Sequence, residues 1–172
     1  MTHPEILDKL AVAFAETEMA GNSFSEAQFF EKPANGKWST AENMQHLFVS
    51  VKPLVGLFGK PELMLQFGKC SRTAMDYDQV INLYHEKLKG FAGSGIVNNV
   101  ESLAPTQAEQ IANLNSIHQK FLERAATLPQ NILDEYQIPH PLMGLLTVRE
   151  FLYFTHYHEG HHTQTMLGLR NS

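Results

Sequence analysis

The chain has 172 residues, suited to one domain over residues 1–172, and its 43% hydrophobic and 18% charged content is ordinary for a globular protein. The formal net charge is −5 and the 13 basic residues are scattered, which argues against a nucleic-acid partner. The chain has a single cysteine, Cys70, which excludes an internal disulfide and suits a reducing compartment. Neither a signal peptide nor an apolar stretch of membrane-spanning length is apparent, so we expect a cytoplasmic protein without a membrane partner.

The first half of the chain predicts two long helices. Thr2 can cap the first helix, which carries an apolar stripe through Phe14 at helical spacing. The second helix begins after Ser39, which forms a capping box with Glu42. Pro53 is expected to kink or end this helix, because proline lacks the N–H that a helix interior needs.

Residues 57–105 are mixed in character. They hold a short amphipathic piece, "DYDQVINLYHEKLKGF", followed by a glycine-bearing loop, "AGSGIVNN". A third long helix is predicted from about Thr106 to Leu128. With a fourth at the C-terminus, the helices predict an all-α fold, a four-helix bundle with a long crossover connection between helices two and three.

The last helix follows a stretch with three prolines, "LPQNILDEYQIPHPLMGLL", which we interpret as an irregular connection. Thr147 and Glu150 form a second capping box at the start of the helix, which runs to about Leu169. No segment shows sustained period-two alternation between turn residues, so no strand is predicted.

Histidines are concentrated in the last helix, in "HYHEGHH" at residues 156–162. At about 100° per residue, His158 and His162 stand one turn apart in an apolar stripe, with His161 beside them and His156 on the opposite face. The stripe also contains Val148, Phe151, Thr155, Thr165 and Leu169. Two imidazoles buried without partners would cost a few kcal/mol, and a shared metal ion removes that cost. The alternative is a pair of hydrogen-bonded core histidines.

A metal site needs a third ligand, and His46 is the strongest candidate. It lies two turns into the second helix beside the buried stripe, and metal sites in bundles are built from facing helices. The weaker candidates lie at a terminus, among charged residues, off a buried stripe, between prolines or on the ligand helix itself: His3, His85, His118, His140 and His161, respectively. Of these, His140 could approach the site at the mouth of the bundle but is loosely placed.

Residues 158–162 also spell H-E-x-x-H, the zincin metalloprotease signature. Only ten residues follow His162, and Thr165 and Gly168 stand where the extended pattern requires glycine and histidine. Glu159 lies about 100° from the direction of His158, which suits a general base but also suits a surface residue. We therefore interpret the match as a coincidence and do not expect a protease.

The stretches "KWSTAENMQH" and "HPLMGLLTVREFLYFTHYHEGHH" resemble the DinB/YfiT-like superfamily. Members carry a Trp-Ser start to helix two, a histidine two turns on and H-x-x-x-H in the last helix, which correspond here to Trp38-Ser39, His46, and His158 with His162. The resemblance spans helix one to the C-terminus and implies an antiparallel four-helix bundle, often a homodimer. It also implies one divalent metal, typically zinc or nickel, on these three histidines with open positions for water. Trp38 and Ser39 match as a core aromatic residue and a helix cap, without functional weight.

The resemblance also implies several activities. Characterised members transfer low-molecular-weight thiols such as bacillithiol, mycothiol or glutathione, one type isomerises maleylpyruvate, and many have been regarded as hydrolases. We therefore expect a metal-dependent S-transferase that acts on a small electrophilic substrate. A metal-dependent hydrolase and a non-catalytic, metal-stabilised binding bundle are the alternatives.

Overall fold

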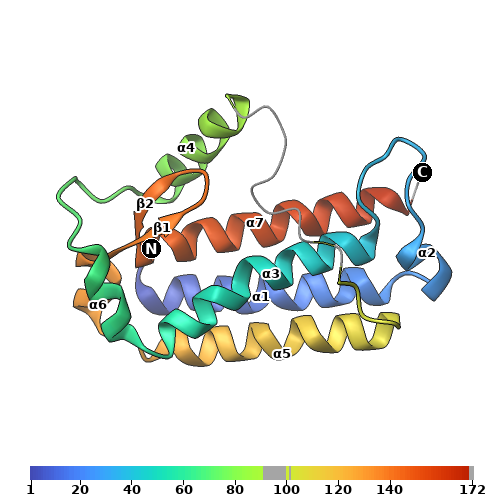
Figure 1. Cartoon of the computed structure of the whole chain (residues 1–172), viewed down its shortest axis with the longest axis horizontal. Coiled ribbons are helices and arrows are strands. Elements are labelled where there is room, and N and C mark those ends of the chain that lie inside the picture. The colour runs from blue at the N-terminus through green and yellow to red at the C-terminus, as the bar shows by residue number, and fades with distance from the viewer. Residues whose placement is uncertain (91–99, 101, 171–172) are drawn as a thin grey trace.

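The computed structural model describes residues 1–90, 100 and 102–170. Four long helices lie side by side (Figure 1): α1 (His3–Asn22), α3 (Thr40–Phe58), α5 (Gln107–Ala126) and α7 (Val148–Leu169). Both α1 and α3 pack against α5 and α7. The shorter elements are α2 (Glu26–Phe30), the 3-10 helix η1 (Pro61–Phe67), α4 (Tyr77–Lys89), α6 (Gln130–Glu135), β1 (Gln137–His140) and β2 (Gly144–Thr147). The prediction of a mainly helical protein is confirmed.

Capping boxes set the starts of three long helices. Thr2, Ser39 and Thr147 each accept a hydrogen bond from the backbone N–H three residues on, and the glutamate there accepts one from the backbone N–H of the cap. This pairing satisfies two N–H groups that the first turn of a helix leaves without partners. The helix starts predicted at these three residues are therefore confirmed.

The sequence predicted that Pro53 would either kink or end its helix. The proline does not end α3. The helix continues to Phe58, and Leu54, Val55 and Phe58 beyond the proline are buried. Burial of such side chains contributes about 1.5–3 kcal/mol each, which offsets the cost of about 3 kcal/mol for a proline in a helix interior.

The connection before α7 is not irregular, and the expectation of no strand was wrong. It contains α6 and an antiparallel hairpin in which Ile138 pairs with Leu146 and His140 pairs with Gly144. Ile138 and Leu146 are buried, so one face of the hairpin packs on the core. Gly144 has a φ of 78°, a left-handed conformation that glycine adopts without strain and that the turn into β2 requires. Four-residue strands are too short for an alternating pattern to stand out in the sequence.

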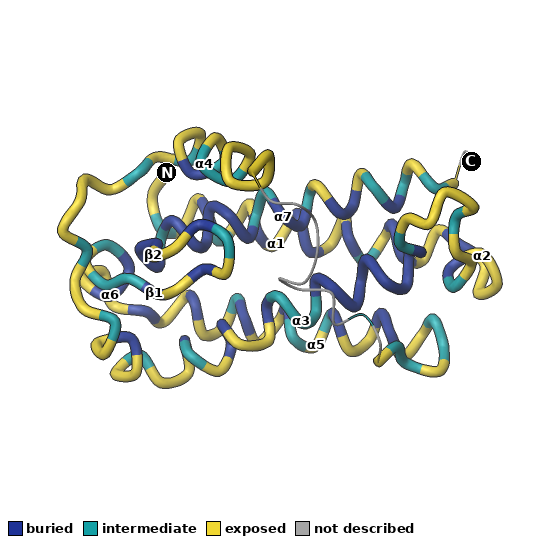
Figure 2. The backbone as a smooth tube through the Cα atoms, turned by 45° about the horizontal axis from the view of Figure 1, so that its top comes forward, coloured by how far each residue is buried: buried dark blue, intermediate teal, exposed yellow. Residues whose placement is uncertain are grey.

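Buried polar side chains separate two apolar clusters along the molecule. Along α1, Thr17 lies between Phe14 of the first cluster and Ala20 of the second. The same order occurs on α5, where the buried His118 lies between Phe121 and Leu114. The buried polar residues in the middle of α7 also lie between side chains of the two clusters. In Figure 2, the buried side of each long helix faces the interior. We call this polar zone the central layer; it contains Thr17, His46, His118, His158, Glu159, His162 and Thr163.

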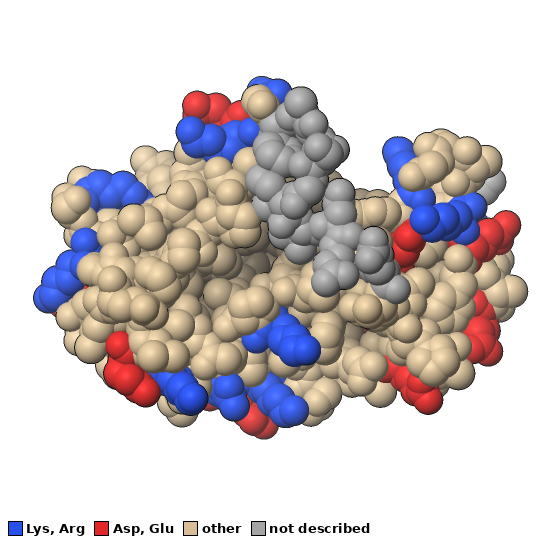
Figure 3. Space-filling view, in the orientation of Figure 1, with Lys and Arg blue, Asp and Glu red and all other residues tan. Residues whose placement is uncertain are grey.

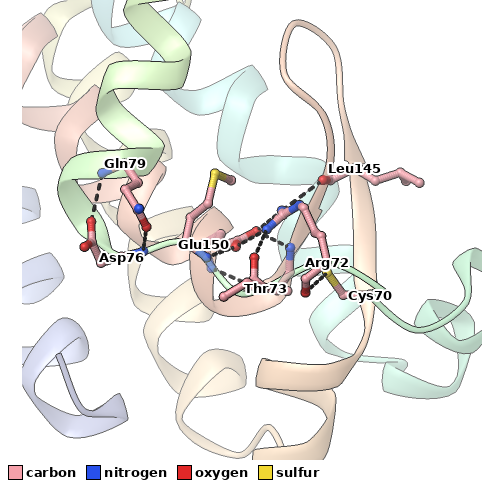
Figure 4. A network of polar contacts seen from close by, with 9 residues as sticks. Cys70, Arg72, Thr73, Asp76, Gln79, Leu145 and Glu150 are labelled. Atoms are coloured by element: carbon pink, nitrogen blue, oxygen red, sulfur yellow. Dashed lines mark hydrogen bonds and ion pairs between the residues drawn. The ribbon is translucent and has the colours of Figure 1, made fainter.

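An ion pair ties the segment before α4 to the start of α7 (Figure 4). Arg72 Nη1 donates to Glu150 Oε1 at 2.7 Å, and Arg72 Nη2 also donates to the carbonyl of Leu145 at 3.3 Å. Glu150 is 1% exposed and accepts further bonds from the backbone N–H groups of Met75 and Thr147. Burial raises the pKa of Glu150, but the bonds from Arg72 and these N–H groups outweigh burial and lower the pKa below its usual value. The amphipathic piece predicted in this connection forms α4, which packs on α7, whereas the predicted loop at residues 92–99 lies outside the described residues.

Replacing Arg72 with methionine is expected to lower the free energy of unfolding at pH 7 by about 1.5–3 kcal/mol, because a buried carboxylate loses a charged hydrogen-bond partner. A carboxyl with a lowered folded-state pKa stabilises the fold above its unfolded value of 4.5, and that contribution is lost as the pH falls through the folded pKa. Denaturant titrations should therefore show that the difference between parent and variant narrows below about pH 4.5. Lys69→Met, which breaks an exposed ion pair with Glu135, is the control and should change stability little.

Among the residues that the structure describes, no helix is long and apolar enough to cross a membrane. On the face shown in Figure 3, basic and acidic side chains are both present, and they lie in several separate places. That nucleic acid is not a partner stays a prediction.

Candidate metal centre

The structure brings together the three histidines that the sequence singled out. His46 of α3 faces His158 and His162 of α7, and all three are buried. The Nε2 atoms of His46 and His158 are 3.0 Å apart, and one nitrogen from each of the three rings lies within 4.8 Å of the others. Two nitrogens bound to one tetrahedral zinc ion at 2.0–2.1 Å would be about 3.3 Å apart. The spacing of the rings therefore suits a shared ion.

An outer hydrogen bond sets the tautomer of His162. His162 Nδ1 is 2.8 Å from Asn43 Oδ1, and the Nδ2 of Asn43 donates to the carbonyl of Ser39 at 2.8 Å. Because an amide oxygen only accepts, Nδ1 of His162 carries the proton and Nε2 keeps its lone pair for a metal. The sequence analysis missed Asn43, although it lies one helical turn before His46 on α3.

Burial keeps the two α7 imidazoles neutral. Burial lowers the pKa of His158 well below its usual value, and the neighbouring imidazoles, His162 first, lower it further. Burial together with His46 and His161 lowers the pKa of His162 to about 2. A neutral imidazole is the form that binds a metal ion. Among the described residues, the cluster offers neutral nitrogen donors, which fit zinc, nickel or a similar divalent transition ion.

A direct hydrogen bond between His46 and His158 is the alternative to a shared metal ion. It would require the Nε2 of one ring to be protonated and the Nε2 of the other to accept. Such a bond involves two of the three rings and gives no reason for the third, His162, to be held with its Nε2 unprotonated. The arrangement of all three rings therefore favours a metal site, and their role as ligands stays a prediction.

Two aromatic side chains form walls beside the three rings. Trp38 stacks near His162, with ring centroids 6.1 Å apart and planes 20° apart, and its ring lies 4.8 Å from that of His46. Phe154 stacks against His158 at 5.1 Å. Trp38, which the sequence suggested is a core aromatic residue, is only half-buried, and its ring lies beside two of the three histidine rings.

Glu159 is not a surface residue, and His118, which was predicted to lie off the buried stripe of its helix, is buried as well. Glu159 is fully buried, and its Oε1 is 3.1 Å from Nε2 of His118, which is 3% exposed. Thr17 of α1 donates to Glu159 Oε2 at 3.0 Å, and Thr163 lies 2.8 Å from the same Thr17 hydroxyl. Both carboxylate oxygens thus contact residues of α1 and α5, whereas the three histidines face one another between α3 and α7. This arrangement does not present Glu159 as a general base beside the metal, which agrees with the rejection of the zincin match.

His140 is better held than its position between two prolines suggested. It is 9% exposed, and its Nδ1 accepts hydrogen bonds from the backbone N–H groups of Leu142 and Met143, both at 3.1 Å. Its ring packs edge-on against Phe154 at 4.5 Å. The expectation of a loosely placed residue was therefore wrong. His140 is not part of the three-histidine cluster.

The other histidines lie outside the cluster. His156 is half-buried, and its Nδ1 is 2.8 Å from the hydroxyl of Tyr77, so it packs against a neighbouring helix. His85 is exposed, as predicted. His161 is exposed on the ligand helix, and His3 lies at the N-terminus of α1.

Replacing Asn43 with alanine is expected to weaken zinc binding by about 10–100-fold, because His162 loses the acceptor that selects its tautomer and orientation. Competition with a chromogenic chelator would measure the affinity. Asn113→Ala, on the exposed face of α5, is the matched control and should bind zinc like the parent. Equal affinities in all three proteins would show that Asn43 does not support a ligand.

In a comparison with protein families, the model of the DinB superfamily matches residues 9–166. A comparison with curated proteins found no match.

Proposed function

Because the chain belongs to the DinB superfamily, we propose that it is a divalent-metal-dependent enzyme that transfers a low-molecular-weight thiol to a small electrophilic molecule. His46, His158 and His162 are the proposed ligands, and zinc or nickel is the proposed metal. The observation that carries the proposal is the buried cluster of three histidines. The acidic residue nearest to them in the sequence, Glu159, has its two carboxylate oxygens hydrogen-bonded to Thr17 and His118.

The choice of a thiol follows from proton transfer. A divalent ion held by three neutral imidazoles would keep its full charge and would stabilise a thiolate beside it. A free thiol has a pKa of about 8.5, whereas that of water is about 15.7, so a thiol needs much less help to lose its proton. In the described ranges of the chain, the cluster consists of histidines alone, and the carboxylate oxygens of the adjacent Glu159 bond to Thr17 and His118. These features favour thiol transfer over hydrolysis.

The protein side chains have three roles in this proposal. Asn43 keeps the proton of His162 on Nδ1, so Nε2 stays available as a ligand. Phe154 and Trp38 hold the ligand rings in place and limit the access of water to them. The ion pair between Arg72 and Glu150 holds the start of α7, the helix that supplies two ligands.

A direct test uses protein purified without a histidine tag. Metal analysis should give about one zinc or nickel ion per chain. The loaded protein should consume glutathione, bacillithiol or mycothiol in the presence of 1-chloro-2,4-dinitrobenzene or monobromobimane. This rate should disappear with a chelator and in His158→Ala, and should persist in His161→Ala, which removes an exposed histidine from the same helix.

Other outcomes would replace the proposal. Metal-dependent hydrolysis of esters or amides without thiol consumption would identify a hydrolase. Bound metal with neither activity would indicate a binding protein. The homodimer expected from the family also stays a prediction, which light scattering can test.

A further inference from the structure

The hydrogen bonds of His140 define its tautomer. Its Nδ1 accepts from two backbone N–H groups, those of Leu142 and Met143, at 3.1 Å each. A ring nitrogen that accepts hydrogen bonds carries no proton, so neutral His140 must carry its proton on Nε2. Burial lowers the pKa of His140 to about 4, which keeps the ring neutral near pH 7. His140 is therefore a fixed donor at Nε2.

The ring of His140 lies close to the metal centre without joining it. It packs edge-on against Phe154 at 4.5 Å and lies 5.2 Å from the ring of Phe151. Phe154 in turn stacks against His158, with ring centroids 5.1 Å apart. Within the described part of the chain, no acceptor lies within hydrogen-bond distance of His140 Nε2. This nearly buried donor is thus available to a bound molecule.

Building on the metal-dependent function proposed above, we propose that His140 is a substrate-binding residue whose Nε2–H donates a hydrogen bond to a carbonyl or carboxylate oxygen of the molecule bound beside the three histidines. A neutral donor of this kind selects oxygen acceptors and gives nothing to a cationic amine. The electrophile would then carry an oxygen acceptor near its reacting carbon.

The rival explanation is that His140 only holds the hairpin tip. The two functions use different ring nitrogens, so they can be separated. In His140→Asn, the amide oxygen can take the place of Nδ1, because asparagine accepts hydrogen bonds from backbone N–H groups shortly after it in turns. The asparagine is too short to supply the donor at Nε2. In His140→Gln, the longer side chain can return an N–H donor near that position.

The first measurement is nitrogen NMR of the His140 ring in the metal-free protein. It should show Nε2 protonated and Nδ1 unprotonated. The same result is expected in the His158→Ala variant, so this measurement does not depend on a metal or on activity. A ring with Nδ1 protonated, or a mixture of both tautomers, would overturn the proposal.

The second measurement is binding of acetate to the zinc-loaded protein, with chloride at equal ionic strength as the control. His140→Asn should weaken acetate binding about 10- to 150-fold, the loss expected for one hydrogen bond to a charged acceptor, with a melting temperature close to that of the parent. His140→Gln should recover part of the affinity. Unchanged acetate binding in His140→Asn would overturn the proposal. If the parent binds acetate through His140 but transfers no thiol, only the function proposed above is overturned.

Discussion

Replacing His46 with alanine is expected to abolish stoichiometric metal binding, with a loss of zinc affinity greater than the 10–100-fold typical of an outer-shell partner. His46 is the one candidate ligand from α3, and its Nε2 is 3.0 Å from that of His158. Without it, His158 and His162 would share an ion held from a single helix. Metal analysis after dialysis and competition with a chromogenic chelator would measure the change.

The same variant should separate the metal contribution to stability from that of the fold. A metal that binds only the folded state adds about 2.7 kcal/mol when its free concentration is 100 times its dissociation constant. A chelator should therefore lower the melting temperature of the parent and barely change that of His46→Ala. His161→Ala should keep the chelator sensitivity of the parent. Equal sensitivity in the parent and His46→Ala would show that His46 is not a ligand.

Replacing His118 with leucine is expected to lower the free energy of unfolding by roughly 3–5 kcal/mol, because it removes one partner of a buried polar pair. Glu159 is fully buried, and His118 Nε2 is 3.1 Å from its Oε1. The variant also loses the stacking of His118 on Phe14, whose ring centroids are 3.8 Å apart. Denaturant titration at pH 7 would measure the loss.

The double variant His118→Leu/Glu159→Leu is the decisive control. Replacing both partners with apolar side chains leaves no unpaired carboxylate, so most of the lost stability should return. Thr17 and Thr163 can still bond to each other, and Thr17 to the carbonyl of Ala13. Zinc affinity should stay within a few-fold of the parent in both variants. A double variant no more stable than the single one would show that the cost does not come from the unpaired Glu159.

The family of the chain and the candidate ligands could be predicted because both depend on local spacing. Capping boxes at Ser39 and Thr147 determine where α3 and α7 begin. Once a helix begins at a known residue, its 3.6-residue repeat determines which side chains share a face. His158 and His162 therefore had to lie together, and His46 had to lie near the buried side of its own helix.

The surroundings of these histidines depended on the tertiary structure. From the sequence, Glu159 could be a general base or a surface residue, because its position on α7 does not show which residues pack against that side of the helix. Thr17 and His118 cover it, from 142 and 41 residues away in the sequence. Such contacts depend on which helices pack together, and no local pattern reports that choice.

His140 shows the same limit at a smaller scale. Three prolines in its segment indicated an irregular connection, yet the buried faces of Ile138 and Leu146 hold a short hairpin against the core. That hairpin turns Nδ1 of His140 toward two backbone N–H groups. The sequence by itself determined the helices and the three histidines that can meet, because these follow from neighbours within two turns. Only the packing of distant segments decided which of the other polar groups are buried and how each is oriented, because burial and hydrogen bonding are set by the atoms that surround a side chain.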